Sequence, residues 1–129
     1  AVNLSKEPLF SLEERIKMVT QATKDFDRVT VEQFDGLVVD YARRKNIKVI
    51  MRGLRMLSDF EYEFQMALTN RKLACDIETI FLMPSEQYSY MSSTLIKEAA
   101  NLGAHLSCFV PDFVESALQK KIKKKRKAI

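Results

Sequence analysis

The stretch that decides the fold is VIMRGLRMLSDFEYEFQ, residues 49–65. It begins with a short apolar run, typical of a buried strand, and continues with Arg52 and Arg55 around a Gly-Leu pair. In an open α/β sheet, ligands bind beyond the carboxyl ends of the strands. The glycine lets a ligand approach the backbone, and the two guanidinium groups suit phosphate oxygens. The stretch therefore predicts an anion site, unless both arginines pair with acids of the next helix, such as Asp59 or Glu61.

Strand and helix signals alternate along the rest of the chain. This alternation predicts an α/β fold, in which a parallel sheet has helices on both faces and right-handed crossovers. The strands are nearly continuous apolar runs, so we expect both of their faces to be buried. The predicted strands are 28–34, 47–51 and 78–83, after a strand end within 1–10. The first predicted helix starts at the Ser11–Glu14 capping box, the second spans 37–45 with Asn46 at its end, and the third spans 59–73 with Ser58 as N-cap. The fourth runs from a cap at Ser92 or Ser93 to about Leu102, before Gly103, and the last starts near Pro111.

Length and charge predict one domain with a basic tail. The chain has 129 residues and no internal linker, which favours a single domain over 1–119 followed by a tail over 120–129. The net charge of +4 comes from the tail, because residues 1–119 hold 14 basic and 17 acidic side chains. Nucleic acid is therefore not the expected partner of the body. The tail could contact RNA or acidic lipid, but a solvated helix end is the favoured interpretation.

Other residue counts exclude several function classes. Cys75 and Cys108 form no CxxC pair, which favours free thiols in a reducing compartment. His105 is the only histidine, so a zinc or histidine-based metal site is not expected. No apolar run approaches the roughly 20 residues of a membrane span, and the start has no secretory signal pattern. The sequence offers no Ser-His-Asp set, carboxylate dyad or nucleophilic cysteine.

Further phosphate-binding features follow other strand ends. Residues 84–98, PSEQYSYMSSTLIKE, open a helix with three hydroxyl residues, and a helix N-terminus attracts anions, although simple N-capping explains the hydroxyls equally well. Lys6 follows the first strand end but is by default a surface residue. Leu37 and Val38 could wall a pocket, with core packing as the default, and Glu63 is by default solvent-facing. Gathered at one rim, these groups favour phosphoryl or nucleotidyl transfer, which needs positioning and charge stabilisation more than acid–base groups.

Three motifs together resemble the bacterial phosphopantetheine adenylyltransferase family: SKEPLFSLEER, VIMRGLRMLSDFEYEFQMALTNRKL and ETIFLMPSEQYSYMSSTLIKE. The likeness extends from Ser5 to about Leu118. It implies a Rossmann-like nucleotidyltransferase fold and transfer of AMP from ATP to 4′-phosphopantetheine, giving dephospho-coenzyme A and pyrophosphate in coenzyme A biosynthesis. It also implies Mg²⁺ carried by ATP without a dedicated protein cage, a homo-oligomer, typically a hexamer, and a cytoplasmic location.

The resemblance also implies roles for individual residues. Lys6 and Arg55 would stabilise the reacting phosphates. The acceptor phosphopantetheine would contact Lys6, Leu37, Val38 and Arg52. ATP would contact Gly53, Leu54, Arg55, Glu63, Tyr88, Ser89, Tyr90, Met91, Ser92, Ser93 and Thr94.

One departure from the family concerns a motif containing glycine and histidine. In the family, a histidine of this motif stabilises the transition state at the α-phosphate, and no such motif occurs here. His105, near the end of a late helix, does not replace it. The chain also begins with Ala1, apparently inside a βαβ unit. We therefore expect that the natural N-terminus is missing and that the 129 residues alone are unstable and inactive or nearly so.

Three alternatives stay open on the sequence. The chain could be another nucleotidyltransferase of the same fold with a different acceptor. It could be a catalytically incomplete fragment that binds a nucleotide or coenzyme A while its basic tail recruits a polyanion. The third alternative is a structural α/β domain whose arginines are all paired internally.

Overall fold

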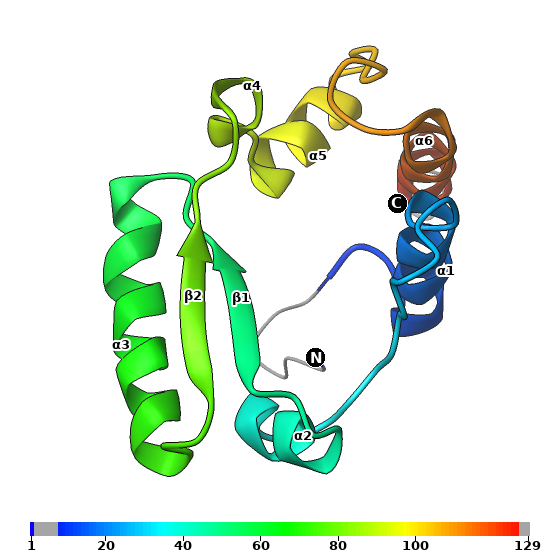
Figure 1. Ribbon diagram of the computed structural model, residues 1–129. Helices are drawn as coiled ribbons and strands as arrows, with labels where there is room; N and C mark the ends of the chain where they lie inside the picture. The colour runs from blue at the N-terminus through cyan, green and yellow to red at the C-terminus, as the bar shows by residue number, and fades with distance from the viewer. Residues whose placement is uncertain (2–7, 127–129) are drawn as a thin grey trace. The chain divides into compact units, whose positions relative to one another are not determined.

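The computed structural model describes Ala1 and residues 8–126, and these fall into two compact units (Figure 1). The first unit comprises Phe34–Tyr90 together with Ala1. The second comprises the described residues of Val2–Gln33 and Met91–Ile129. The expected single domain over 1–119 stays a prediction.

A parallel two-stranded sheet organises the first unit. Strand β1 (Val49–Gly53) pairs with β2 (Glu78–Leu82), and the register runs from Val49 opposite Glu78 to Gly53 opposite Leu82. Helix α3 (Leu57–Leu73) joins the strands, as a crossover between parallel strands requires, and it lies beside β2 (Figure 1). The prediction of an α/β fold with a parallel sheet is confirmed.

Three predictions about the strands were wrong. The strand predicted at 47–51 occurs two residues later, so Arg52 and Gly53 belong to the ladder, opposite Phe81 and Leu82. No strand forms at 28–34, where a turn joins the N–H of Val29 to the carbonyl of Phe26, because alternation alone does not supply a hydrogen-bonding neighbour. The strands are also not buried on both faces, because a sheet of two strands leaves much of its surface uncovered.

The core of the first unit lies where helix α2 (Val38–Arg44) meets the segment between α3 and β2. Val39 and Ala42 of α2 pack against Ala74 and Ile77, with Ile50 of β1 at the margin. Asn46 follows the C-cap Lys45 of this short helix with a left-handed φ of 56°, a conformation that asparagine tolerates at a helix end. Asn46 at the end of this helix was predicted correctly. This cluster fixes the start of β1.

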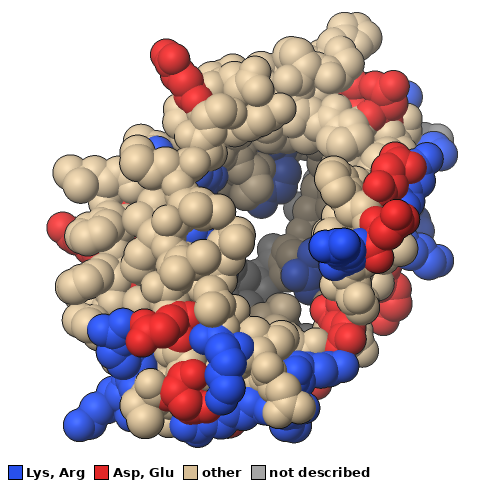
Figure 2. Space-filling model, in the orientation of Figure 1, with Lys and Arg blue, Asp and Glu red and all other residues tan. Residues whose placement is uncertain are grey.

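Two basic side chains share Asp76 beside this core. Arg43 donates to Asp76 Oδ1 at 2.9 Å, and Lys48 donates to Oδ2 at 2.9 Å. These hydrogen bonds, first from Lys48 and then from Arg43, lower the pKa of Asp76 to about 2. Basic and acidic side chains gather at the lower left of Figure 2, over the region where α2 meets the two strands. The three residues thus link α2, β1 and the segment before β2.

The described part of the second unit contains three helices, α1 (Leu12–Ala22), α5 (Ser93–Asn101) and α6 (Asp112–Arg126). The predicted capping box is present, since Ser11 Oγ accepts from the N–H of Glu14 at 3.2 Å and Glu14 Oε2 accepts from the N–H of Ser11 at 2.7 Å. Gly103, predicted to follow α5, has a φ of 87°. The core of this unit consists of Ala100, Leu106, Leu118 and Ile122. Helix α6 extends to Arg126, so it includes the described part of the predicted tail over 120–129.

Helix ends were predicted less well in the first unit. Helix α3 begins at Leu57, after the N-cap Met56, so Ser58 lies inside the helix and the prediction of Ser58 as N-cap was wrong. A short helix α4 (Glu86–Ser89) that the sequence did not suggest follows β2. Ser92 caps α5 by accepting from the N–H of Thr94 at 3.3 Å, which selects one of the two predicted caps.

Among the described helices, none has the length and apolar character needed to cross a bilayer.

We predict that Asp76→Asn lowers the melting temperature at pH 7. A carboxyl whose pKa is depressed on folding contributes stability above its unfolded value of 3.8, and the contribution is lost as the pH falls through the folded value of about 2. The variant and the parent chain should therefore differ at pH 7 and converge near pH 2, as followed by circular dichroism. Asp40→Asn, on exposed α2 surface, is the control. An Asp76→Asn deficit that persists unchanged in acid would contradict this account.

Candidate active site

Arg52 and Glu63 form the best-defined polar pair at the end of β1. Arg52 Nε donates to Glu63 Oε2 at 2.7 Å, and Nη2 donates to Oε1 at 2.5 Å, so the contact is bidentate. The side chain of Glu63 is 11% exposed and that of Arg52 is 44% exposed. The hydrogen bonds to Glu63 raise the pKa of Arg52. The default expectation that Glu63 faces solvent was wrong, because α3 turns this residue towards β1.

Arg55 is held by the first turn of α3. Its Nε donates to Asp59 Oδ2 at 3.1 Å, and its backbone N–H donates to the same oxygen at 3.3 Å. These hydrogen bonds lower the pKa of Asp59, with the guanidinium contact the largest cause. Both side chains are only partly buried, at 44% and 27% exposed. The alternative that both arginines pair with acids of the next helix is therefore confirmed, with Asp59 as the partner of Arg55 and Glu63 rather than Glu61 as the partner of Arg52.

Helix α3 provides a carboxylate partner for each of the two arginines, and the sequence analysis did not predict both pairs. Asp59 and Glu63 are four residues apart, so they lie on the same face of α3, one turn after the other. That face meets the end of β1, and each carboxylate takes one arginine. Glu61, the other acid suggested from sequence, is exposed and off this face. The i, i+4 spacing of Asp59 and Glu63 was the signal that could have identified both pairs.

The two ion pairs leave groups at this end of the sheet that can still bind a ligand. Glu63 occupies Nε and Nη2 of Arg52, and within the described residues Nη1 has no partner. A methyl group on Gly53 would meet no described atom within 4 Å, so the backbone is open to close approach. The N–H of Leu54 is used, since it donates to the carbonyl of Leu82 at 2.9 Å. An anion can therefore share Arg52 with its carboxylate rather than displace it.

Other predicted site residues of the first unit are more scattered. Tyr88, Ser89 and Tyr90 follow β2 around α4, and the two tyrosines are 53% and 63% exposed. Leu37 is the half-exposed N-cap of α2, and Val38 packs on the core, as its default interpretation predicted. In Figure 1, α2 lies at the start of the strands, so the structure does not bring its residues to Arg52.

The remaining predicted residues lie outside the described residues or in the second unit. Lys6 lies outside the described residues. Met91, Ser92, Ser93 and Thr94 belong to the second unit. His105 lies exposed between α5 and α6, also in the second unit. The roles that the resemblance implies for these residues stay predictions.

Comparison with known proteins identifies the class. The cytidylyltransferase-like family matches residues 2–99, so the chain belongs to this family of nucleotidyltransferases. Within it, the chain belongs with the phosphopantetheine adenylyltransferases. The protein of that name from Caldanaerobacter subterraneus is 55% identical over 95% of this chain and 77% of its own length. Those from Desulfosudis oleivorans and Dictyoglomus thermophilum are 54% and 50% identical, over 94% and 100% of this chain and 72% and 79% of their own lengths.

We predict that Glu63→Gln destabilises the chain by about 1 kcal/mol, the upper end for a partly exposed charge pair. The glutamine keeps the shape but removes the charge that balances the half-buried Arg52. The free energy of unfolding from urea denaturation measures the effect, which should shrink in high salt. Glu61→Gln, on the exposed face of the same helix, is the matched control and should change little. Equal losses in the two variants would show that the ion pair contributes nothing specific.

Proposed function

We propose that this chain serves adenylyl transfer from ATP to 4′-phosphopantetheine, which yields dephospho-coenzyme A and pyrophosphate in coenzyme A biosynthesis. The observation that carries the proposal is the high identity to proteins named phosphopantetheine adenylyltransferase along nearly the whole chain. The two arginines at the end of β1 support it, because they provide positive charge for phosphate groups at the ligand-binding edge of a parallel sheet.

The proposed roles follow the family motifs. Arg52 binds the phosphate of the acceptor, while Gly53, Leu54 and Arg55 contact ATP. Glu63, which the resemblance places at ATP, also acts as a positioning residue, because it fixes the guanidinium of Arg52 through two hydrogen bonds. The remaining contacts are proposed from the resemblance alone. They comprise Lys6, Leu37 and Val38 for the acceptor and Tyr88, Ser89, Tyr90, Met91, Ser92, Ser93 and Thr94 for ATP, with Lys6 also at the reacting phosphates.

The proposed reaction needs little acid–base help from the protein. An oxygen of the acceptor phosphate attacks the α-phosphorus of ATP, the new P–O bond forms, and the bond to the pyrophosphate oxygen breaks. A phosphate monoester has its second pKa near 6, so the attacking oxygen is already deprotonated at neutral pH. The side chains then contribute by holding two anions together and by stabilising the charge on the transferred group.

Magnesium, assembly and location are part of the proposal. The described residues offer no group of three His, Cys, Asp or Glu side chains suited to a metal ion. The resemblance to the family assigns Mg²⁺ to the phosphates of ATP, where it usually keeps several waters and neutralises phosphate charge. A cytoplasmic homo-oligomer, in the hexameric form typical of the family, completes the proposal.

We predict that Arg52→Gln weakens phosphopantetheine binding and that Arg55→Gln weakens ATP binding, each by about tenfold or more. A charged hydrogen bond contributes about 1.5–3 kcal/mol, and about 1.4 kcal/mol is a factor of ten. Isothermal titration calorimetry of each variant with each ligand measures the effect. Arg44→Gln, on the exposed end of α2, is the matched control and should bind both ligands like the parent chain.

The same titrations separate the alternatives. If the chain bound another phosphorylated acceptor more tightly than phosphopantetheine, the proposed substrate would be wrong but the enzyme class would stand. Unchanged affinity in both Arg52→Gln and Arg55→Gln would overturn the assignment of the rim and favour a structural domain with internally paired arginines. Nucleotide or coenzyme A binding that survives deletion of residues 120–129, while polyanion binding is lost, would favour a non-catalytic module.

We also predict that the 129-residue polypeptide itself shows little or no turnover. Its sequence has one histidine, His105, which lies exposed between α5 and α6 rather than in a motif with glycine. Pyrophosphate release from ATP and phosphopantetheine, with the intact mass of the polypeptide recorded alongside, measures turnover. Robust turnover by a species with the mass of 129 residues would refute this expectation, although it would support the proposed reaction.

A further inference from the structure

Asp59 contacts Arg55 through both its backbone and its side chain. Oδ2 of Asp59 accepts from the backbone N–H of Arg55 at 3.3 Å and from the Nε of the same residue at 3.1 Å. Nη2 of Arg55 also lies 3.5 Å from Oδ1, at the limit of a hydrogen bond. One carboxylate therefore sets the direction of the guanidinium relative to the main chain that carries it.

The turn that carries Arg55 is anchored on both sides. Leu54, the preceding residue, donates its N–H to the carbonyl of Leu82 at 2.9 Å, which ties the turn to β2. Asp59, the third residue of α3, donates its own N–H to the carbonyl of Met56 at 3.0 Å. The carboxylate that holds Arg55 thus comes from a helix start whose backbone is itself hydrogen-bonded.

Two interpretations of this contact make different predictions. An acid in the first turn stabilises a helix start, and the N-cap Met56 makes no side-chain hydrogen bond of its own, so Asp59 could act on stability alone. That role requires only the backbone N–H. Asp59 also binds Nε of Arg55, whose side chain is 44% exposed and therefore accessible to a ligand.

We propose that Asp59 is a positioning residue for the nucleotide, which holds Arg55 in the orientation in which its guanidinium meets the phosphates of ATP. The inference rests on the proposed function, in which Arg55 contacts ATP. Ordering a long side chain on binding lowers affinity, and Asp59 orders this one before the ligand arrives. The charge of Asp59 acts in the opposite direction, because a carboxylate near the site repels phosphate. The sign of the change in ATP affinity when this charge is removed therefore separates orientation from simple electrostatics.

The test is a double-mutant cycle on the full chain, with ATP and phosphopantetheine binding measured by isothermal titration calorimetry. Asp59→Asn should weaken ATP binding about threefold to tenfold, the effect of ordering one long side chain, and leave phosphopantetheine binding unchanged. In the Arg55→Gln background, the same substitution should have no further effect on ATP binding, because no guanidinium is left to orient. A residue that only stabilises the helix start would change ATP affinity by the same factor in both backgrounds, or not at all.

Glu61→Gln is the matched control, because Glu61 is an exposed acid of the same helix. It should bind ATP like the parent chain, and thermal unfolding by circular dichroism checks that each variant is folded during the titration. If Asp59→Asn does not fold, Asp59→Glu keeps an acid in the first turn, which suits a helix start, but moves the carboxylate by one methylene group. This variant should still weaken ATP binding, by about threefold or more, because a small displacement of a positioning group is enough to misplace the group it holds.

The outcomes distinguish this inference from the proposed function. If Arg55→Gln weakens ATP binding while Asp59→Asn binds ATP as tightly as the parent chain, or more tightly, the role of Asp59 is overturned and the proposed function stands. Equal loss from Asp59→Asn in both backgrounds, equal loss for phosphopantetheine, or equal loss in Glu61→Gln would overturn that role as well. Unchanged ATP affinity in Arg55→Gln, or no ATP binding by the parent chain, would overturn both the role of Asp59 and the assignment of Arg55 to ATP.

Discussion

The ladder between β1 and β2 is the constraint on which the first unit depends. Its register places Arg52 opposite Phe81 and Gly53 opposite Leu82, and the bond from the N–H of Leu54 to the carbonyl of Leu82 extends it by one residue. Because the strands are parallel, both chain segments leave the sheet at the same edge. A shift by one residue would turn Arg52 to the other face and away from Glu63. The position of the candidate site is thus a consequence of backbone pairing before any side chain acts.

Helix α3 then determines how the arginines are presented. Its Asp59 and Glu63 lie one turn apart, and each holds one guanidinium in place. The carboxylates reduce the net positive charge that a phosphate would meet, so they weaken simple electrostatic attraction. They also reduce the number of side-chain arrangements that must be lost on binding. This arrangement suits a site that must orient two substrates, for which geometry matters more than affinity for any single anion.

The sequence predicted features that depend on local chemistry and failed where tertiary partners decide. The capping box at Ser11 and Glu14, the left-handed end at Asn46 and the helix after β1 all follow from nearby residues. Residues 28–34 have the composition of a strand, yet whether they form one depends on a neighbour far along the chain. Similarly, the motif placed Arg52 near the end of a strand, although not within the ladder, whereas its pairing with Glu63, eleven residues later, depends on how α3 packs against the sheet.

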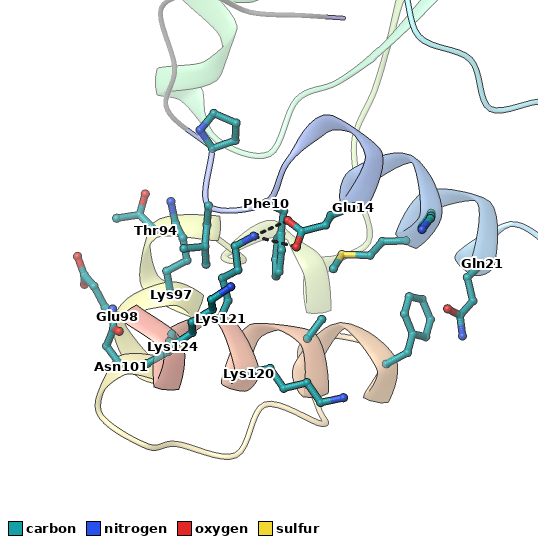
Figure 3. A pocket seen from close by; sticks show the side chains of 17 residues that line it. Phe10, Glu14, Gln21, Thr94, Lys97, Glu98, Asn101, Lys120, Lys121 and Lys124 are labelled. Carbon is teal, nitrogen blue, oxygen red and sulfur yellow. Dashed lines mark hydrogen bonds and ion pairs between the residues drawn. The ribbon is translucent and has the colours of Figure 1, made fainter. Parts of the chain in front are cut away.

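The two units differ in how charge is used, and this difference bears on their roles. In the first unit, Arg43, Arg52 and Arg55 each pair with a carboxylate, which holds the guanidinium group in one orientation. In the second unit, Lys121 pairs with Glu14 (Figure 3), and other lysines of α6, such as Lys120 and Lys123, are exposed. Guanidinium forks held by carboxylates favour ligands of defined geometry, whereas a lysine ammonium is a compact charge on a flexible stem. The two units therefore present positive charge in two different ways, and the fixed guanidinium groups of the first unit suit the orientation of substrates.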